Sequence, residues 1–513
     1  MAIVIGLDVG TSGTKALAID ASGAVLASAL VEYPLHSPKP GWAEQDPADW
    51  RKAAMEAISQ LTTALGAKRS EVAAVGLTGQ MHGSVFLDEN DAVLRPALLW
   101  CDQRTDKECA EITQTVGEAR LIEMVSNPAL TGFTAPKILW LRNNEPEVFA
   151  KVRKVLLPKD YIRLCLTGEY AADVADASGT LLFDVTNRKW HDELLGLLGI
   201  DPAWMPKTFE GNEVTGTITK DAAEATGLPE GIPVIAGGGD QAAGGVGCGV
   251  VKPGVLSAAL GTSGVVFAFA EAVRTDPQGR VHTFCHSVPG AWHVMGVVLS
   301  AGGSLRWYRD AVCDTEIAKA KESGRDPYEY ITEAAETAPV GSEGLTFLPY
   351  LTGERTPHKD PYAKGAFIGF HLRHTKAHMA RAVMEGVSFA MRDSLEILRE
   401  MGVPITEVRA SGGGARSAFW RQMQADIYGC PIVTTNVDEG PAYGAALLAL
   451  TATGDYATVA DACDATIKPV STVEPNAAAS RAYDDWFAEY QQAYTALKPG
   501  FARVATLLET SAS

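Results

Sequence analysis

Two short stretches of this chain combine glycine with hydroxyl side chains, and they repeat one another. GLDVGTSGTKALAI spans residues 6–19 and LGTSGVVFAF spans residues 260–269, so Gly-Thr-Ser-Gly occurs twice. These residues suit a tight turn, because glycine accepts a positive φ and the hydroxyls bond nearby amides. They equally suit an anion site, because clustered backbone N–H groups and hydroxyls can hold phosphate oxygens. Asp8 would have a role in such an anion site. A carboxylate repels phosphates unless a cation lies between them, and Mg²⁺ binds carboxylate and phosphate oxygens together.

A second aspartate stands after a buried strand near the middle of the chain. IPVIAGGGDQAAGGVGCG (232–249) places three glycines directly before Asp240. An aspartate at a strand-to-helix junction is a good helix N-cap, which is one interpretation. The other is a general base, because the glycines leave the carboxylate unobstructed at the end of a strand, where α/β sites form. Such a group could take a proton from a substrate hydroxyl while phosphate is transferred.

Other phosphate-binding motifs fit this chain poorly. The sequence contains no G-x-x-x-x-G-K-[ST], so it has no P-loop. GGGDQA (237–242) follows a strand and matches the dinucleotide fingerprint G-x-G-x-x-A. Its aspartate would face the pyrophosphate, however, and no acidic residue lies between Asp240 and Glu271, where the ribose contact belongs. The pattern therefore disfavours a dinucleotide-dependent oxidoreductase.

Some residues invite a chemical interpretation that their neighbours do not support. His371, His374 and His378 have the spacing of metal ligands, but Arg and Lys residues crowd them and no carboxylate is adjacent. We expect no metal there. Cys101 has no nearby histidine pattern to activate it, so we do not expect a nucleophile. His82, between Met and Gly, is either a chance surface histidine or a ligand contact.

Composition excludes several classes of protein. The 513 residues are 46% hydrophobic and 21% charged, with a formal net charge of −18 and no basic run of five or more. Such a chain should repel nucleic acid and anionic membranes. The eight cysteines form no Cys-x-x-Cys pair, and the N-terminus lacks a cationic start. We therefore expect a cytoplasmic protein with no membrane span.

The secondary structure expected around these motifs is that of an α/β protein. Strand patterns occur at 3–9, 14–20, 24–30 and 72–79, and helix patterns begin near Asp46 and span 375–401, 415–428 and 440–454. Each half of the chain begins with a strand pair that carries a Gly-Thr-Ser-Gly turn. We expect two α/β domains that face a cleft, with a boundary near residue 245.

The motifs together resemble a known family. GLDVGTSGTKALAID, GGGDQAAG, LGTSGV and ASGGGARSAFWRQMQADI are similar to stretches of the FGGY carbohydrate kinases, as are GFTAPKILWLRNN (132–144) and KGAFIGF followed by ARAVMEG. The resemblance implies two actin-like (ribonuclease H-like) ATPase domains, 1–245 and 246–513, that flank a central cleft. It also implies ATP and Mg²⁺ as cofactors, and it suggests a homodimer.

Within that family, the chain is most similar to bacterial members that phosphorylate D-xylulose. WAEQDPADW (42–50), GQMHG (79–83), LLPKDYIRL (156–164) and FLPYLTGERTPH (347–358) carry this likeness. The implied reaction is transfer of the ATP γ-phosphoryl group to D-xylulose, giving D-xylulose 5-phosphate. A kinase for another ketopentose or polyol, such as D-ribulose, remains an alternative. So does a non-kinase ATP-binding module of the actin and Hsp70 superfamily.

The resemblance also assigns expected roles to individual residues. Asp240 is the expected catalytic base, and Asp8 is expected to act at the metal and the phosphates. The expected sugar contacts are Met81, His82, Asp240 and Gln241. The expected nucleotide contacts are Thr11, Ser12 and Gly13 in the first loop, Gly261 and Thr262 in the second, and Gly302, Gly413, Gly414 and Ala415 around the nucleoside.

The chain departs from the family pattern at two positions near these residues. Gln241 stands where asparagine is expected after the catalytic aspartate, and Cys101 stands where asparagine is expected within W-x-D. A glycerol-phosphorylating member would have Arg-Glu in place of Met81-His82, so a ketose substrate is expected. Gln241 leaves the identity of that ketose open.

Overall fold

The computed structural model describes residues 2–511, and the chain divides into two compact units. Unit 1 consists of Met1–Lys252, Phe269–His293 and Glu439–Lys468, and unit 2 consists of Pro253–Ala268, Val294–Asp438 and Pro469–Ser513. The chain first leaves unit 1 after Lys252. A single boundary does not describe the division, however, because two later segments return to unit 1.

The core of unit 1 is a twisted sheet with the strand order β13-β14-β5-β1-β2-β3, in which β15 also pairs with β5. These strands are β1 (Ile3–Val9), β2 (Gly13–Asp20), β3 (Val25–Glu32), β5 (Val72–Gly79), β13 (Val214–Thr217), β14 (Pro233–Ile235) and β15 (Gly238–Gly239). The strands predicted at 3–9, 14–20 and 24–30 are confirmed as β1, β2 and β3, which pair antiparallel in sequence order. β5 runs parallel to both β1 and β15, so the carboxyl ends of these three strands share one edge of the sheet.

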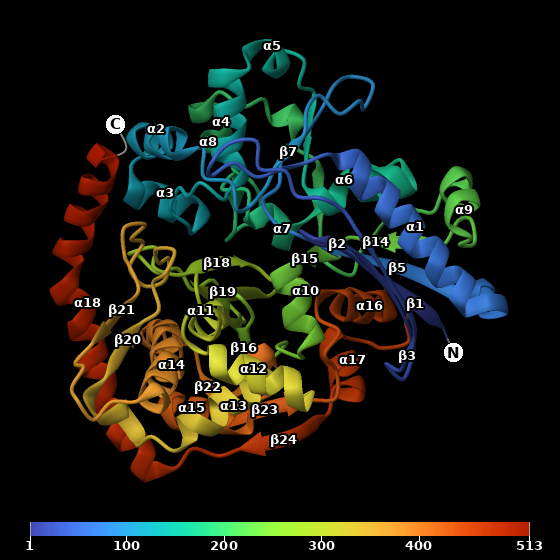
Figure 1. Ribbon diagram of the computed structural model, residues 1–513. Coiled ribbons are helices and arrows are strands. Elements are labelled where there is room, and N and C mark those ends of the chain that lie inside the picture. The colour runs from blue at the N-terminus through green and yellow to red at the C-terminus, as the bar shows by residue number, and fades with distance from the viewer. Residues whose placement is uncertain (1, 512–513) are drawn as a thin grey trace. The chain divides into compact units, whose positions relative to one another are not determined.

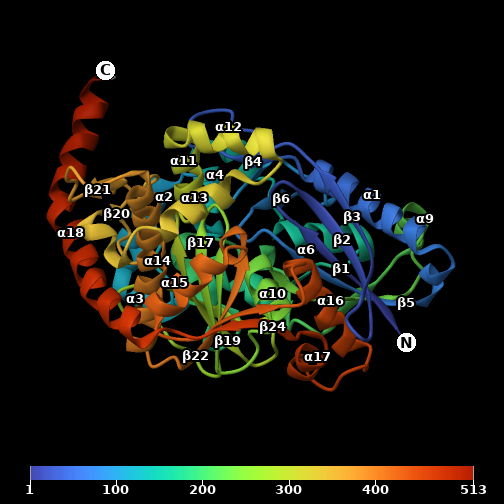
Figure 2. The same ribbon diagram turned by 60° about the horizontal axis from the view of Figure 1, so that its bottom comes forward.

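Helices cover both faces of this sheet (Figures 1 and 2). The helices of unit 1 are α1 (Pro47–Leu65), α2 (Asp106–Val116), α3 (Glu118–Val125), α4 (Thr134–Asn144), α5 (Pro146–Phe149), α6 (Pro158–Thr167), α7 (Val174–Ser178), α8 (Asp192–Leu198), α9 (Lys220–Thr226), α10 (Asp240–Gly247), α16 (Pro441–Ala452) and α17 (Val459–Thr466). α1 packs against β2 and β3, whereas α16 packs against β1 and β5. A Cβ atom at Gly6 would lie 1.8 Å from the Ala442 carbonyl oxygen, and one at Gly76 would lie 2.0 Å from that of Ala445. Glycine at these two positions therefore lets α16 lie directly on the sheet.

Short strand pairs extend unit 1 beyond the main sheet. They are β4 (Glu44–Gln45) with β7 (Ala97–Leu98), β6 (Val85–Leu87) with β8 (Lys154–Leu156), β9 (Ala171–Asp173) with β12 (Lys207–Phe209), and β10 (Phe183–Asp184) with β11 (Lys189–Trp190). The returning segment 269–293 adds β18 (His282–Cys285). The segment between β5 and β6 carries Met81 and His82.

Unit 2 contains a second sheet in which β19, β17, β16, β22, β23 and β24 are neighbours in that order. Its strands are β16 (Gly254–Leu260), β17 (Gly264–Ala270), β19 (Trp292–Val298), β22 (Ile405–Gly412), β23 (Ile432–Thr435) and β24 (Pro469–Val473), and β20 (Thr346–Leu348) pairs with β21 (Ala366–Ile368) apart from it. β16 pairs antiparallel with β17 and parallel with β22. This repeats the β1, β2 and β5 pattern of unit 1.

The helices of unit 2 include the longest ones of the described chain. They are α11 (Gly302–Val312), α12 (Asp314–Ser323), α13 (Pro327–Glu336), α14 (Lys376–Glu400), α15 (Ala418–Tyr428) and α18 (Ala477–Ser511). The long helix predicted at 375–401 is confirmed as α14, whose N-terminus is capped by a capping box between Thr375 and His378. No helix within residues 2–511 is both long and apolar enough to cross a membrane.

Candidate active site

The first Gly-Thr-Ser-Gly turn joins β1 to β2, and neighbouring side chains hold its carbonyl groups. The Tyr33 hydroxyl donates to the Gly10 carbonyl at 2.5 Å, and the Gln80 amide donates to it at 3.3 Å. The Gln45 amide donates to the Thr11 carbonyl at 2.7 Å. Within the described chain, the N–H groups of Thr11 and Ser12 have no acceptor. The turn therefore presents backbone donors in a fixed conformation, as an anion site requires.

Gly13 begins β2 and closes this turn. The Gly10 N–H donates to the Gly13 carbonyl at 3.0 Å. A Cβ atom on Gly13 would lie 2.8 Å from the carbonyl oxygen of Val31, so only glycine fits against β3 here. Ser12, by contrast, is exposed. The predicted first loop, Thr11 to Gly13, is thus a compact turn with its middle open to solvent.

Asp8 lies one residue before the end of β1, opposite Lys15 of β2 and Thr78 of β5. Its Oδ1 atom is buried and accepts no hydrogen bond from any described residue. Burial and the negative charge of Asp240 raise the pKa of Asp8 to about 7, although Lys15 opposes this shift. A buried, unpartnered carboxylate oxygen with a second carboxylate nearby is a site that a divalent cation would stabilise. The residues at this edge therefore fit Mg²⁺.

Asp240 is the first residue of α10, directly after β15. Gly239 is the N-cap residue, so the interpretation of Asp240 as the N-cap is wrong by one position. The difference arises because β15 pairs with β5 up to Gly239, so the helix begins with Asp240. Burial raises the pKa of Asp240 to about 6, while a 3.3 Å hydrogen bond from the Gln241 amide favours the carboxylate. The group can therefore exchange a proton near neutral pH.

Met81 and His82 lie beside the residue that precedes Asp240. A Cβ atom on Gly239 would lie 2.7 Å from Met81 Cγ, so glycine lets the two segments touch. Both side chains are largely buried, with 4% and 8% of their surface exposed. His82 Nδ1 lies 2.6 Å from the Gly179 carbonyl oxygen and must carry the proton, which leaves Nε2 as an acceptor. The structure thus brings Met81, His82, Asp240 and Asp8 to one edge of the unit 1 sheet.

The second Gly-Thr-Ser-Gly turn joins β16 to β17 in unit 2 and borders a cavity. Gly302 begins α11 and donates its N–H to the Gly261 carbonyl at 2.9 Å. A Cβ atom on Gly302 would lie 2.4 Å from that carbonyl oxygen. Arg306 donates to the Thr262 hydroxyl at 2.8 Å. Residues of the second loop and of α11 therefore form one continuous wall.

The cavity has a volume of about 710 Å³, and most of the predicted nucleotide contacts of unit 2 line it. Gly261, Thr262, Gly302, Gly413 and Gly414 are among the lining residues. Ala415, the last residue of the short 3₁₀ helix Gly413–Ala415, is not. The further lining residues are Leu260, Leu305, Arg306, Arg309, Asp326, Tyr328, Glu329, Thr332, Arg416, Ser417 and Trp420. The size and the mixed lining suit a nucleoside with its phosphates.

The domain families decide between the kinase and the alternatives. Residues 3–247 match the N-terminal domain of the FGGY family of carbohydrate kinases, and residues 256–453 match the C-terminal domain. The chain belongs to this family. The FGGY kinase has the actin-like ATPase fold and is an ATP-dependent sugar kinase. The dinucleotide oxidoreductase and the non-kinase ATP-binding module are thereby set aside.

Individual relatives of this FGGY kinase are similar over nearly their whole length. A xylulose kinase of Escherichia coli is 44% identical over 448 residues, which are 87% of this chain and 89% of the relative. A crystal structure described as a "xyloylose kinase" from Brucella ovis has a TM-score of 0.89 at 40% identity and covers 97% of this chain and 99% of its own. A gluconokinase of Bacillus subtilis is 32% identical over 88% of both chains. Relatives with different acceptor sugars therefore share this fold.

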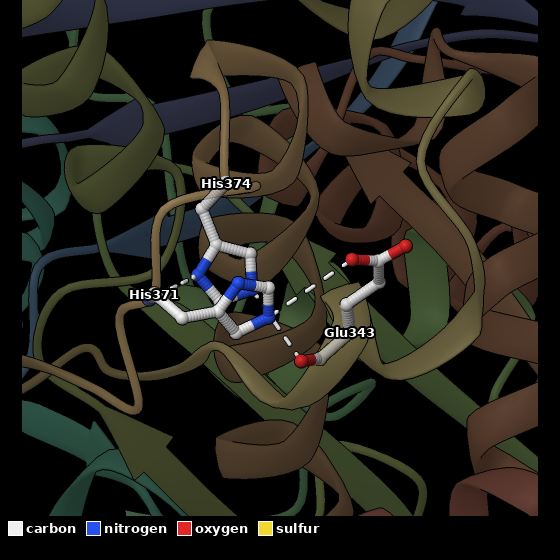
Figure 3. Close-up of side chains that lie close together, drawn as sticks. All are labelled: Glu343, His371 and His374. Atoms are coloured by element: carbon white, nitrogen blue, oxygen red, sulfur yellow. Dashed lines mark hydrogen bonds and ion pairs between the residues drawn. The ribbon is translucent and has the colours of Figure 1, made fainter.

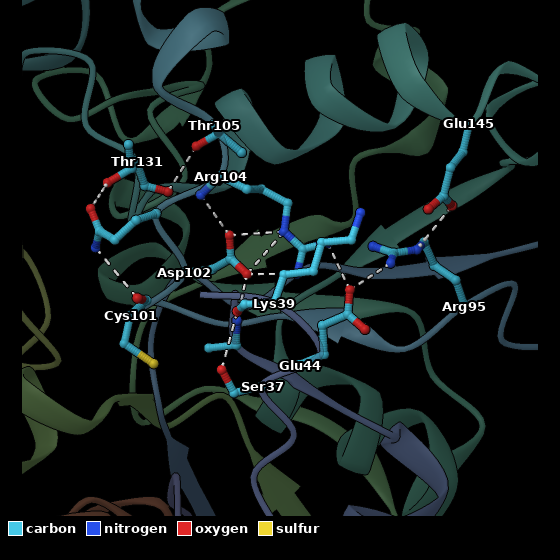
Figure 4. A network of polar contacts seen from close by, with 12 residues as sticks. Ser37, Lys39, Glu44, Arg95, Cys101, Asp102, Arg104, Thr105, Thr131 and Glu145 are labelled. Carbon is cyan, nitrogen blue, oxygen red and sulfur yellow. Dashed lines mark hydrogen bonds and ion pairs between the residues drawn. The ribbon is translucent and has the colours of Figure 1, made fainter. Parts of the chain in front are cut away.

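Two family stretches of the kinase meet in a buried polar network (Figure 4). Arg104 donates to both carboxylate oxygens of Asp102 and to Glu44, and Arg95 donates to the same Glu44 oxygen at 2.8 Å. Through Glu44 and Arg104, the network connects β4 to the segment that follows β7. The Cys101 thiol points away from it in Figure 4, and burial raises the pKa of that thiol. The cysteine is therefore a poor nucleophile, as the sequence predicts.

The structure adds a carboxylate to the histidine group of unit 2, which the sequence did not predict. Glu343 lies beside His371 and His374, with ligand atoms of all three within 4.8 Å of one another (Figure 3). However, His374 Nδ1 accepts the N–H of His371 at 3.0 Å, and His371 Nδ1 accepts that of Arg373 at 3.2 Å. Because each Nδ1 accepts a hydrogen bond, each neutral ring carries its proton on Nε2, toward Glu343. A metal-bound histidine usually does the opposite, since it binds the metal through one ring nitrogen and donates the N–H of the other. Hydrogen bonding therefore explains the arrangement of Glu343, His371 and His374 better than a metal site does.

Sequence reasoning missed several residues that shape the Met81–His82 region of unit 1 and the cavity of unit 2. In unit 1, Lys137 and Thr134 contact the backbone of His82. Both belong to GFTAPK, which carried the family likeness but suggested no role. In unit 2, α13 contributes Tyr328 and Glu329 to the cavity. No local pattern signals that α13 approaches the second loop, because the contact depends on tertiary packing.

Proposed function

We propose that the kinase transfers the γ-phosphoryl group of ATP to a ketopentose, with D-xylulose as the foremost candidate. The observation that carries the proposal is the position of Asp240, a part-buried carboxylate with a pKa of about 6 that directly follows Gly239, the residue packed against Met81. Such a group is ionised at neutral pH and can accept a hydroxyl proton. The names of the xylulose kinase relatives support D-xylulose.

Each residue of unit 1 has a role in this proposal. Met81 and His82 contact the sugar, and His82 Nε2 accepts a hydrogen bond from one of its hydroxyl groups. Asp240 removes the proton from the O5 hydroxyl as that oxygen attacks the γ-phosphorus atom, and the bond from that phosphorus to the bridging oxygen breaks, so that ADP leaves. Gln241 donates to Asp240 and orients its carboxylate. General-base assistance of this kind contributes about 10²- to 10⁴-fold to the rate.

The nucleotide roles are divided between the two Gly-Thr-Ser-Gly turns. Thr11, Ser12 and Gly13 would bind phosphate oxygens through backbone and hydroxyl donors, as would Gly261 and Thr262. Gly302, Gly413 and Gly414 would line the nucleoside, with Ala415 next to them. Asp8 would hold Mg²⁺, which neutralises the phosphates when bound. The unpartnered Oδ1 of Asp8 supports this assignment.

Another acceptor sugar is the second candidate, and Gln241 is the observation that favours it. Gln241 directly follows the proposed base and is part-buried. Compared with the asparagine expected at this position, its side chain is one methylene longer and would lie close to the proposed sugar site. The gluconokinase relative shows that acceptors differ among proteins of this similarity. D-ribulose is the ketopentose alternative.

An ADP-release assay tests the proposal directly. The wild-type enzyme, ATP and Mg²⁺ are assayed with D-xylulose, D-ribulose, L-ribulose, L-xylulose, D-fructose, xylitol, D-arabinitol, glycerol and D-gluconate. We expect kcat/KM for D-xylulose to exceed every other value by about tenfold, which corresponds to about 1.4 kcal/mol of transition-state binding. A different best acceptor would contradict the D-xylulose assignment and leave the phosphoryl transfer. No turnover with any acceptor would contradict the proposal as a whole.

A further inference from the structure

The turn that carries His82 has an unusual backbone conformation. The Gly83 N–H donates to the Met81 carbonyl at 2.9 Å, and the residue between them, His82, has a φ of 67°. An i to i+2 hydrogen bond around a positive φ is a classic γ-turn, which is rare and strained. Holding a non-glycine residue in such a conformation costs about 1–3 kcal/mol. The surroundings of His82 must therefore stabilise the turn.

Two buried side chains at the start of α4 hold this turn by its carbonyl group. The Lys137 ammonium group donates to the His82 carbonyl at 2.8 Å, and the Thr134 hydroxyl donates to it at 3.1 Å. Lys137 also donates to the Gly132 carbonyl at 2.7 Å, which fastens it to the entry of the helix. Together with the 2.6 Å contact from Nδ1 to the Gly179 carbonyl, these bonds fix both the backbone and the ring of His82.

The burial of Lys137 shows how unusual this arrangement is. The side chain is fully buried and, among the described residues, it forms no ion pair within 4.0 Å. A buried ammonium group without a paired carboxylate is costly, and burial lowers the pKa of Lys137 to about 7. An apolar residue would pack the same space at no such cost. The presence of a lysine at this position is therefore best explained by the hydrogen bonds that it donates to the His82 and Gly132 carbonyl groups.

We propose that Lys137 and Thr134 are positioning residues for sugar recognition: they hold the His82 carbonyl in the strained turn and thereby orient the imidazole toward the sugar. This inference rests on the proposed sugar contact of His82. The bonds act on the backbone of His82 and not on the sugar, so their loss should weaken sugar binding while nucleotide binding stays unchanged.

The experiment compares two substitutions at one position with a matched control. Thr134→Val removes the hydroxyl and keeps the shape, whereas Thr134→Ser keeps the hydroxyl. Thr62→Val is the control, because the buried Thr62 hydroxyl likewise donates to a distant carbonyl, that of Thr226, at 2.6 Å. We expect Thr134→Val to raise the KM for the best acceptor sugar about tenfold. Thr134→Ser should keep the sugar KM close to the wild-type value. The KM for ATP should stay within about twofold of the wild-type value in all three variants.

A double-mutant cycle distinguishes positioning from a general loss of structure. If Thr134 acts through His82, Thr134→Val should have little further effect on the sugar KM in a His82→Ala background. An equal effect in both backgrounds, or no effect of Thr134→Val in the wild-type background, overturns the inference and leaves the proposed function intact. Failure of the wild-type enzyme to phosphorylate any sugar would refute the proposed function and the inference with it.

Lys137→Met extends the test to the charged member of the pair. The substitution keeps the length of the side chain and removes both hydrogen bonds, so we expect a larger rise in the sugar KM, about 10- to 100-fold. Thermal unfolding followed by circular dichroism checks that the variant folds. If it does not fold, the Thr134 variants still decide the question. A folded Lys137→Met enzyme with an unchanged sugar KM overturns the role of Lys137.

Discussion

Asp240→Asn tests the central chemical assignment, because it changes one atom and leaves the site's shape intact. Asparagine keeps Oδ1, which accepts the 3.3 Å hydrogen bond from Gln241, and it is tolerated in the first turn of α10. The variant cannot accept the hydroxyl proton. We therefore expect kcat to fall by about 10²- to 10⁴-fold, or roughly 3–5 kcal/mol of transition-state stabilisation. The KM values for ATP and sugar should change much less.

The pH dependence gives a second, independent measurement of the same group. With a pKa of about 6, about nine-tenths of Asp240 is protonated at pH 5. We therefore expect the wild-type kcat/KM for the sugar to fall to about a tenth of its plateau at pH 5, with a slope that approaches tenfold per pH unit. Asp8 titrates nearby, so the observed inflection belongs to the pair. The residual rate of Asp240→Asn should show a different inflection, because only Asp8 of the pair then titrates.

The assay is the coupled ADP-release measurement from pH 5 to pH 8, with Asp46→Asn as the matched control. Asp46 is an exposed N-cap of α1, and asparagine caps a helix equally well, so this variant should behave as the wild type does. Turnover of Asp240→Asn within about tenfold of the wild type would refute the general-base role. The same pH inflection in both enzymes would show that another group titrates.

Three further predictions follow from distances and charges within unit 1 and within unit 2. Asp8→Asn should raise the KM for Mg²⁺·ATP, and it should also raise the free energy of unfolding at pH 8 by up to about 4 kcal/mol, because the folded pKa of Asp8, about 7, exceeds the unfolded value near 4. Chemical denaturation should show that this stabilisation disappears toward pH 4. An unchanged free energy of unfolding at pH 8 would contradict a destabilising buried charge at Asp8. Gly179→Ala should raise the sugar KM, because its Cβ atom would lie 2.7 Å from the His82 ring, and an unchanged KM would argue against His82 as a sugar contact. Gly302→Ala should weaken ATP binding in calorimetry but leave sugar binding unchanged, because its Cβ atom would lie 2.4 Å from the Gly261 carbonyl oxygen.

Local sequence patterns predicted the elements around the site, because these depend on nearby residues. The strand pattern at residues 3–9 corresponds to β1, and the pattern at 72–79 corresponds to β5. Glycine-rich turns after these strands were visible for the same reason. The proposed positions of Asp8, His82 and Asp240 follow from such strand ends, and the structure does bring these three residues to one edge.

Contacts between distant segments could not be predicted in this way. The helix at 441–452 was predicted as a helix of the second half, yet it packs on the sheet of unit 1. Gly6 and Gly76 allow this contact, but in the sequence they are only glycines within strands. Lys137 and Glu343 were missed for the same reason, because their partners lie 55 and about 30 positions away.

The topology of the unit 1 sheet explains why its polar groups converge. β5 pairs in parallel with both β1 and β15, with Gly79 of β5 opposite Val9 of β1 and also opposite Gly239 of β15. Asp8, the Met81–His82 turn and Asp240 therefore reach the same edge irrespective of their side chains, as ligand sites in α/β sheets commonly do. Chemistry common to the family can then reside in residues fixed by strand register. Acceptor preference would reside in what surrounds them, such as Gln241 and the strained turn held by Lys137, so substitutions there should change the sugar before they change the reaction.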